Sequence, residues 1–140
     1  MRIRSLVLAA TAGAMLPAAV SAQGDIIAQL FEKAAAIYKD KGYAPTGTDQ
    51  RGELGEGAET RLTIKATGGT AFSVVGVCDL DCGNLDIRLL GIDGSEVAKD
   101  VEDDDFPIVN FEKPGTYTVR VTMVKCKSSP CAFGIKAFKQ

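Results

Sequence analysis

The apolar residues of the chain change their spacing near residue 42, and this change separates two kinds of predicted structure. Between residues 25 and 41 they recur every three or four positions, which predicts an amphipathic helix of about four turns. Asp25 at the start, and Lys39 and Lys41 at the end, suit the charges of a helix dipole, and Gly42 is a typical stop. We expect the apolar stripe to pack on the rest of the domain; the alternative is that it binds a partner. The stripe consists of Ile26, Ile27, Leu30, Phe31, Ala34, Ile37 and Tyr38.

From Thr60 onward, apolar and polar residues alternate, which is the period of a strand with one buried face. Residues 116–124 show this most clearly, and the Asp93-Gly94 pair predicts a hairpin turn. Seven short strands separated by turns predict a mainly β protein, an antiparallel jelly-roll-like β-sandwich with one N-terminal amphipathic helix. Residues 43–59 are rich in glycine, threonine and charge, and we interpret them as a linker with room for one short strand around residues 52–54.

Residues 1–22 have the pattern of a signal peptide. Arg2 and Arg4 precede an apolar stretch, and Val20-Ser21-Ala22 fits cleavage before Gln23. The stretch is short for a membrane span of about 20 residues, although an uncleaved anchor is the alternative. We therefore expect a periplasmic or secreted protein with no stable membrane span after cleavage. The predicted organisation is a signal peptide (1–22), a helix (23–42), a linker (43–59) and a sandwich domain (60–140).

The exported part holds an even number of cysteines, Cys78, Cys82, Cys126 and Cys131. In an oxidising compartment such cysteines form disulfides. The short spacings favour the local pairs Cys78–Cys82 and Cys126–Cys131, each closing a small loop where a strand ends. The alternative is a zinc site with four thiolates, but structural zinc usually binds cysteines two residues apart.

Composition excludes several classes of function. The chain has no histidine, which excludes Ser-His-Asp and Cys-His catalytic sets and imidazole metal ligands. Its net charge is −2 and it has no run of basic residues, which argues against nucleic acid as a partner.

Acidic residues are concentrated between Asp79 and Asp105, where only Arg88 and Lys99 oppose them. Calcium binds six to eight hard oxygen ligands on rigid loops, and a disulfide would stiffen the loop that carries the first of these acids. The alternative is a solvated acidic rim that faces the lysine-rich C-terminal strands. The candidate calcium ligands are Asp79, Asp81, Asp86, Asp103, Asp104 and Asp105.

The order of motifs after residue 75 resembles a known family. An LDIRL strand, an Asp-Gly turn, a DDDFP acidic segment and a GTYTVRV strand follow one another. This order resembles the bacterial pre-peptidase C-terminal domain group, jelly-roll-like β-sandwiches appended to secreted peptidases. The paired cysteine loops are more similar to small exported bacterial proteins built on that sandwich. The resemblance implies an accessory or targeting module, and some members of the group bind calcium or matrix polymers.

These observations lead to one functional expectation and two alternatives. We expect an exported, non-catalytic binding or accessory module of the bacterial envelope, with an envelope protein or an extracellular polymer as partner. The alternatives are a structural exported protein with no dedicated ligand and, third, a hydrolase-associated domain.

Overall fold

The computed structural model describes Gly13 and residues 25–140, with the side chain of Thr48 left aside. The predicted signal peptide and its cleavage site therefore lie outside the described residues. Within the described part, no helix is long and apolar enough to cross a membrane.

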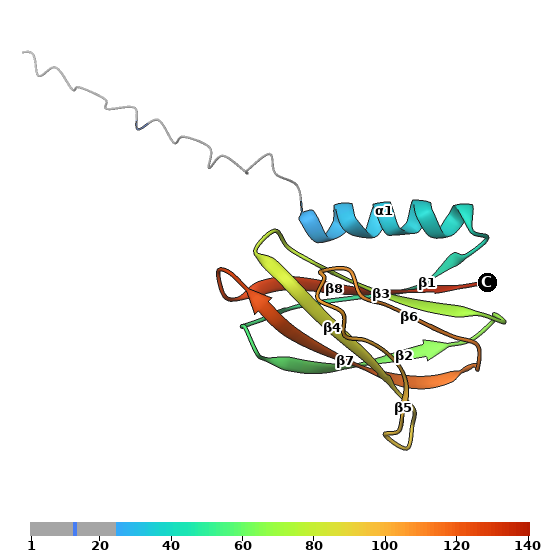
Figure 1. Ribbon diagram of the computed structural model, residues 1–140. Coiled ribbons are helices and arrows are strands. Elements are labelled where there is room, and N and C mark those ends of the chain that lie inside the picture. Colours follow the sequence, from blue (N-terminus) through green and yellow to red (C-terminus); the bar gives the residue numbers. More distant parts are fainter. Residues whose placement is uncertain (1–12, 14–24) are drawn as a thin grey trace, which may run out of the picture.

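The described chain begins with the predicted helix, α1, which spans Ile26–Asp40 (Figure 1). The carboxylate of Asp25 accepts hydrogen bonds from the backbone N–H groups of Ile27 and Ala28, at 3.1 and 3.3 Å, and so caps the helix. Gly42, with a φ of 84°, follows the last turn. The buried side chains of the helix are Ile27, Phe31, Ala34 and Tyr38.

Eight antiparallel strands follow the helix and form two four-stranded sheets. One sheet has the order β1-β8-β3-β6 and the other has the order β2-β7-β4-β5. This arrangement confirms the predicted β-sandwich with one N-terminal helix. The strands are β1 (Ala44–Leu54), β2 (Glu59–Ala66), β3 (Phe72–Cys78), β4 (Cys82–Leu90), β5 (Glu96–Asp100), β6 (Ile108–Phe111), β7 (Gly115–Cys126) and β8 (Cys131–Lys139).

The prediction of a linker at residues 43–59 is wrong, because most of that segment is the edge strand β1, which pairs with β8. An edge strand is held by backbone hydrogen bonds on one side and can expose most of its side chains, so its sequence lacks an apolar alternation. The structure explains why position 52 is a glycine, because a Cβ atom there would lie 2.8 Å from the ring of Phe133. The sandwich domain therefore includes residues that the sequence had assigned to the linker.

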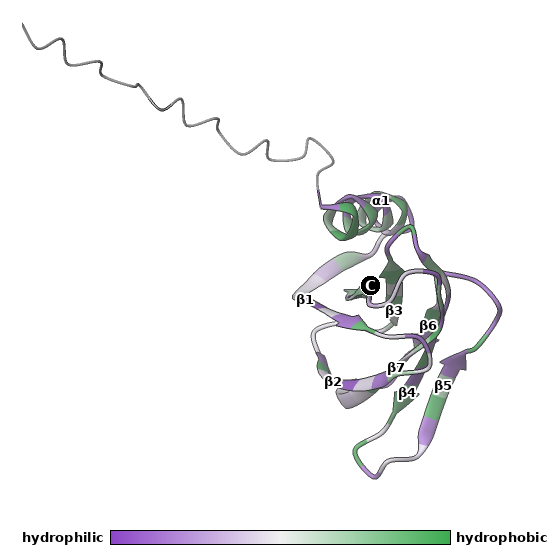
Figure 2. Cartoon of the chain, turned by 90° about the vertical axis from the view of Figure 1, so that its left-hand side faces the viewer, coloured by the Kyte–Doolittle hydropathy of each residue, from purple (hydrophilic) through white to green (hydrophobic). Residues whose placement is uncertain are grey.

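The core has two layers. One lies between the two sheets and contains the inward-facing residues of β4 and β7, such as Leu85, Ile87 and Val119. The other lies between α1 and the outer face of the first sheet, where Val75, Val77 and Phe138 meet the helix. Figure 2 shows the helix lying on this sheet, so the expected packing of the helix on the rest of the domain is confirmed.

Ile37 does not belong to the buried stripe, contrary to the prediction. It is 50% exposed, while Tyr38, its neighbour in sequence, is 5% exposed. Tyr38 stacks on Phe138 with ring centroids 4.3 Å apart, and its hydroxyl shares a 2.6 Å hydrogen bond with Ser73. The aromatic contact orients the end of the helix so that Ile37 points away from the sheet.

Candidate functional site

Both predicted disulfides form, and they lie at the same end of the sandwich. Cys78–Cys82 closes the loop between β3 and β4, and Cys126–Cys131 closes the loop between β7 and β8. The two loops are neighbours because Cys82 and Cys126 face each other across the β4–β7 pair. We call these two loops, residues 78–82 and 126–131, the disulfide end.

Hydrogen bonds join the two loops of the disulfide end into one rigid unit. The carboxylate of Asp79 accepts from the backbone N–H of Ala132 at 2.7 Å and from that of Asp81 at 3.1 Å. The backbone N–H of Lys127 donates to the carbonyl oxygen of Asp81 at 2.8 Å. Asp79 thus holds the loops together, a role that the sequence did not indicate when it placed this residue among the calcium ligands.

The turn between β1 and β2 supports the disulfide end from the side. The carboxylate of Glu56 accepts from the backbone N–H of Cys126 at 3.1 Å, and the backbone N–H of Glu56 donates to the hydroxyl of Ser129 at 3.1 Å. Leu80, in the loop closed by Cys78 and Cys82, is 90% exposed. The disulfide end therefore presents an exposed apolar side chain on a loop whose backbone is held in place.

The six predicted calcium ligands do not form one cluster. Asp79 and Asp81 belong to the disulfide end, while Asp103 forms an ion pair with Lys125 at 3.1 Å. Asp104 accepts a hydrogen bond from the backbone N–H of Phe106. Asp86 lies on β4, close enough to Asp103 and Asp104 for their charges to raise its pKa, and Asp105 is exposed.

A different set of carboxylates is brought together. Asp100, Glu102 and Asp104 each place one carboxylate oxygen within 4.8 Å of the others. Asp100 is also fixed by hydrogen bonds from the backbone N–H groups of Glu102 and Ile108, at 3.2 and 2.9 Å. The predicted set included only Asp104 of these three, because spacing along the sequence does not show how the segment after β5 folds. Calcium binding stays a prediction.

Asp86 has an unusual environment for a carboxylate. Burial raises the pKa of Asp86 above its usual range, and the charges of Asp100, Asp104 and Asp103 raise it further against the opposing effect of Arg88. One of its oxygens, Oδ1, is buried without a hydrogen-bond partner among the described residues. Ionised Asp86 is therefore a destabilising group in the folded protein.

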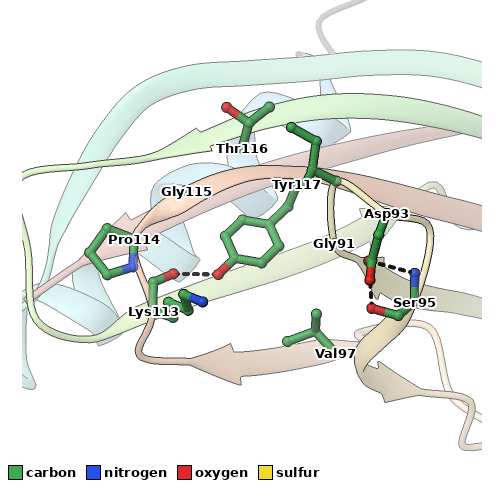
Figure 3. A pocket seen from close by; sticks show the side chains of 10 residues that line it. Gly91, Asp93, Ser95, Val97, Lys113, Pro114, Gly115, Thr116 and Tyr117 are labelled. Atoms are coloured by element: carbon green, nitrogen blue, oxygen red, sulfur yellow. Dashed lines mark hydrogen bonds between the residues drawn. The ribbon is translucent and has the colours of Figure 1, made fainter.

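The opposite end of the sandwich contains a hollow of about 490 Å³ between the β4–β5 turn and the β6–β7 loop (Figure 3). Its walls are mostly apolar. Tyr117 forms part of them, and its hydroxyl donates to the carbonyl oxygen of Lys113, which fixes the β6–β7 loop. The residues lining the hollow are Gly91, Ile92, Asp93, Ser95, Val97, Lys113, Pro114, Gly115, Thr116 and Tyr117.

Asp93 and Ser95, two polar residues of the hollow, stabilise the β4–β5 turn by hydrogen bonds to each other. Asp93 accepts from the hydroxyl of Ser95 at 2.6 Å and from its backbone N–H at 3.0 Å, and these bonds hold the pKa of Asp93 below its usual range. The sequence analysis missed the hollow because its residues come from two turns that are separate in the sequence. An isoleucine inside a turn, Ile92, was the one signal that could have indicated it.

Comparisons with known proteins agree with the fold. No protein-family model matches the chain, and no curated protein matches it in sequence. Twelve solved chains match it in structure. One of them is the pre-peptidase C-terminal domain of collagenase from Bacillus anthracis, at a TM-score of 0.50 and 17% sequence identity, covering 64% of this chain and 87% of the other. The chain therefore has the fold of a pre-peptidase C-terminal domain, as the order of its motifs predicted.

Proposed function

We propose that this protein is an exported, non-catalytic accessory module that binds an envelope protein or an extracellular polymer. The observation that carries the proposal is the disulfide end, where two short disulfide loops are joined into one rigid surface. Disulfides persist in oxidising compartments, which supports a periplasmic or secreted location. The likeness to a domain of a collagenase supports an accessory role.

The chemistry of the chain supports the absence of catalysis. Without histidine, a serine nucleophile would need another base, and the hydroxyl of Ser95 donates to Asp93 inside a turn. All four cysteines are in disulfides, so none is available as a thiolate. A rigid surface with a projecting leucine is suited to binding instead.

Export is tested by expressing the full chain in a Gram-negative host beside a variant that lacks residues 2–22. We expect the full chain in the periplasmic fraction, beginning at Gln23, with Cys78 joined to Cys82 and Cys126 joined to Cys131 in non-reducing peptide maps. The shortened variant should stay in the cytoplasm with reduced thiols. Full-length protein with four free thiols in the cytoplasm would contradict the proposal.

Binding is tested in the producing bacterium with a photo-crosslinking residue at Leu80, and with one at Ile37 as a control that is also exposed and apolar. Crosslinks to a defined envelope component from position 80, absent from position 37, are expected. The same products from both positions, or none, would favour the structural alternative.

A further inference from the structure

Leu80 has no role inside the molecule that explains its position. Its side chain is 90% exposed, and the backbone of the loop that carries it is held by the Cys78–Cys82 disulfide and by the hydrogen bonds of Asp79. Because the backbone of this loop is already held, a partner that buries Leu80 restricts only the rotamers of its side chain. The disulfide end therefore offers one apolar side chain that a second molecule can bury.

The hollow at the other end of the sandwich has matching properties. Ile92 and Val97 stand at it and are 92% and 47% exposed, so apolar surface is left uncovered there. The turn and the loop that form its walls are both fixed, by the bonds of Asp93 to Ser95 and of Tyr117 to Lys113 (Figure 3). A leucine side chain is small enough to enter a hollow of about 490 Å³.

The two features cannot meet within one molecule. The disulfide end precedes β4 and the hollow follows it, and nine extended residues separate them by about 30 Å. Figure 1 shows β4 running from one end of the sandwich to the other. Only a second molecule can bring Leu80 to this hollow.

Charge complements shape at the two surfaces. Asp81 and Lys127 lie beside Leu80, joined through the backbone, and both are exposed. Lys113 and Asp93 line the hollow. Among the described residues, neither Asp81 nor Lys113 has an ion-pair partner, so each can pair with the other across an intermolecular contact.

We propose that the protein associates head to tail, with Leu80 of one copy inserted into the hollow of the next and Asp81 paired with Lys113. Because the two surfaces are at opposite ends of the molecule, the contact does not close as a symmetric dimer; it adds further copies head to tail, into an open chain or a ring. The contact is small, so the association is weak and dependent on concentration. This inference does not depend on export, and since only one molecule at a time can bury Leu80, the next copy and an envelope partner compete for this surface.

The experiment is analytical ultracentrifugation of the purified protein, with both disulfides formed, from about 10 µM to about 1 mM, the range in which contacts of this size associate. The average mass should rise with concentration and pass that of a dimer. Leu80→Asp and Val97→Asp should each remain monomeric, while Ile37→Asp, a change at an exposed apolar residue of α1, should behave as the unchanged protein. Circular dichroism of each variant verifies that it is folded.

Mixing the two monomeric variants, Leu80→Asp and Val97→Asp, tests the direction of the contact. The Leu80→Asp protein keeps its hollow and the Val97→Asp protein keeps its leucine, so an equimolar mixture should form one-to-one dimers and nothing larger. A monomeric mixture, a monomeric unchanged protein, or association that persists in Leu80→Asp would each overturn the proposal.

An exchange of charges tests the proposed pairing of Asp81 with Lys113. Asp81→Lys should weaken association about tenfold, the size of an effect expected from a like-charge contact at an interface. The further change Lys113→Asp should restore it in the double variant. Equal association in all three proteins would overturn the assigned pairing of Asp81 with Lys113.

Discussion

At the scale of single residues, the carboxylate of Asp86 is unfavourable in the folded protein when it is ionised. Its neighbours on β4, Leu85 and Ile87, are fully buried in the core, so Asp86 is held on the opposite face of the strand. There it is half-buried. Burial raises its pKa, and the charges of three other carboxylates raise it further. A side chain of the same shape without the charge would fit this position better.

Asp86→Asn should therefore raise the free energy of unfolding at pH 7. The folded protein disfavours the ionised carboxylate, so the cost is present above the raised pKa of the folded state. It is absent below the ordinary pKa of about 3.9, where the group is protonated in both states. Urea denaturation at pH 7 and near pH 3.5 should show the gain at the higher pH only. Asp81→Asn removes the same charge from an exposed loop, and an equal gain from that control would mean that only net charge matters.

At the scale of elements, the contact between α1 and the first sheet depends on the absence of a side chain. Gly134 on β8 lies directly beneath the helix, and a Cβ atom there would be 2.5 Å from the ring of Phe31 and 2.7 Å from Ile27. Next to it, the ammonium of Lys136 pairs with Asp49 at 2.8 Å and lies 5.4 Å from the ring centre of Phe31. The helix thus packs closely on β8 because Gly134 has no side chain there.

Gly134→Ala should destabilise the protein by about 1–3 kcal/mol, the usual cost of forcing extra volume into a packed core. The matched control is Gly83→Ala on β4, where a Cβ atom would make only an ordinary contact, 3.5 Å from Lys125. Urea midpoints of the two variants give the comparison. Equal midpoints would show that the helix can move away from the sheet at little cost.

The sequence predicted elements where burial imposes a period, and failed where it does not. The helix and the strand at residues 116–124 each bury one face, so their apolar residues repeat at 3.6 or 2 positions. The edge strand β1 buries little and was taken for a linker. The disulfides were predicted because the cysteines are close in sequence, whereas the hollow and the group of Asp100, Glu102 and Asp104 depend on how separate turns fold.

At the scale of the whole molecule, the covalent links and the core occupy different places. Both disulfides close loops of a few residues at one end, while the core runs the length of both sheets. Leu89 and Val119, near the opposite end, are fully buried without any help from a disulfide. The fold therefore depends on the core, and the disulfides determine the shape of one surface.

Replacing Cys126 and Cys131 by serine should lower the free energy of unfolding by about 2 kcal/mol, since so short a loop removes little entropy from the unfolded chain. The same holds for Cys78 and Cys82. Far-UV circular dichroism should be unchanged in both double variants, and hydrogen exchange should increase only in the loops. A loss of strand signal in either variant would show that the sandwich itself requires the bond.

The position of β8 in the strand order has a consequence for folding during synthesis of the chain. β8 lies between β1 and β3, and it also forms the surface under α1, yet it follows every other strand in the chain. The helix and β1 are synthesised before β8 and lack this packing surface until β8 has been made. The first sheet can therefore be completed only after β8 has been synthesised, and its other strands lack their central partner until then.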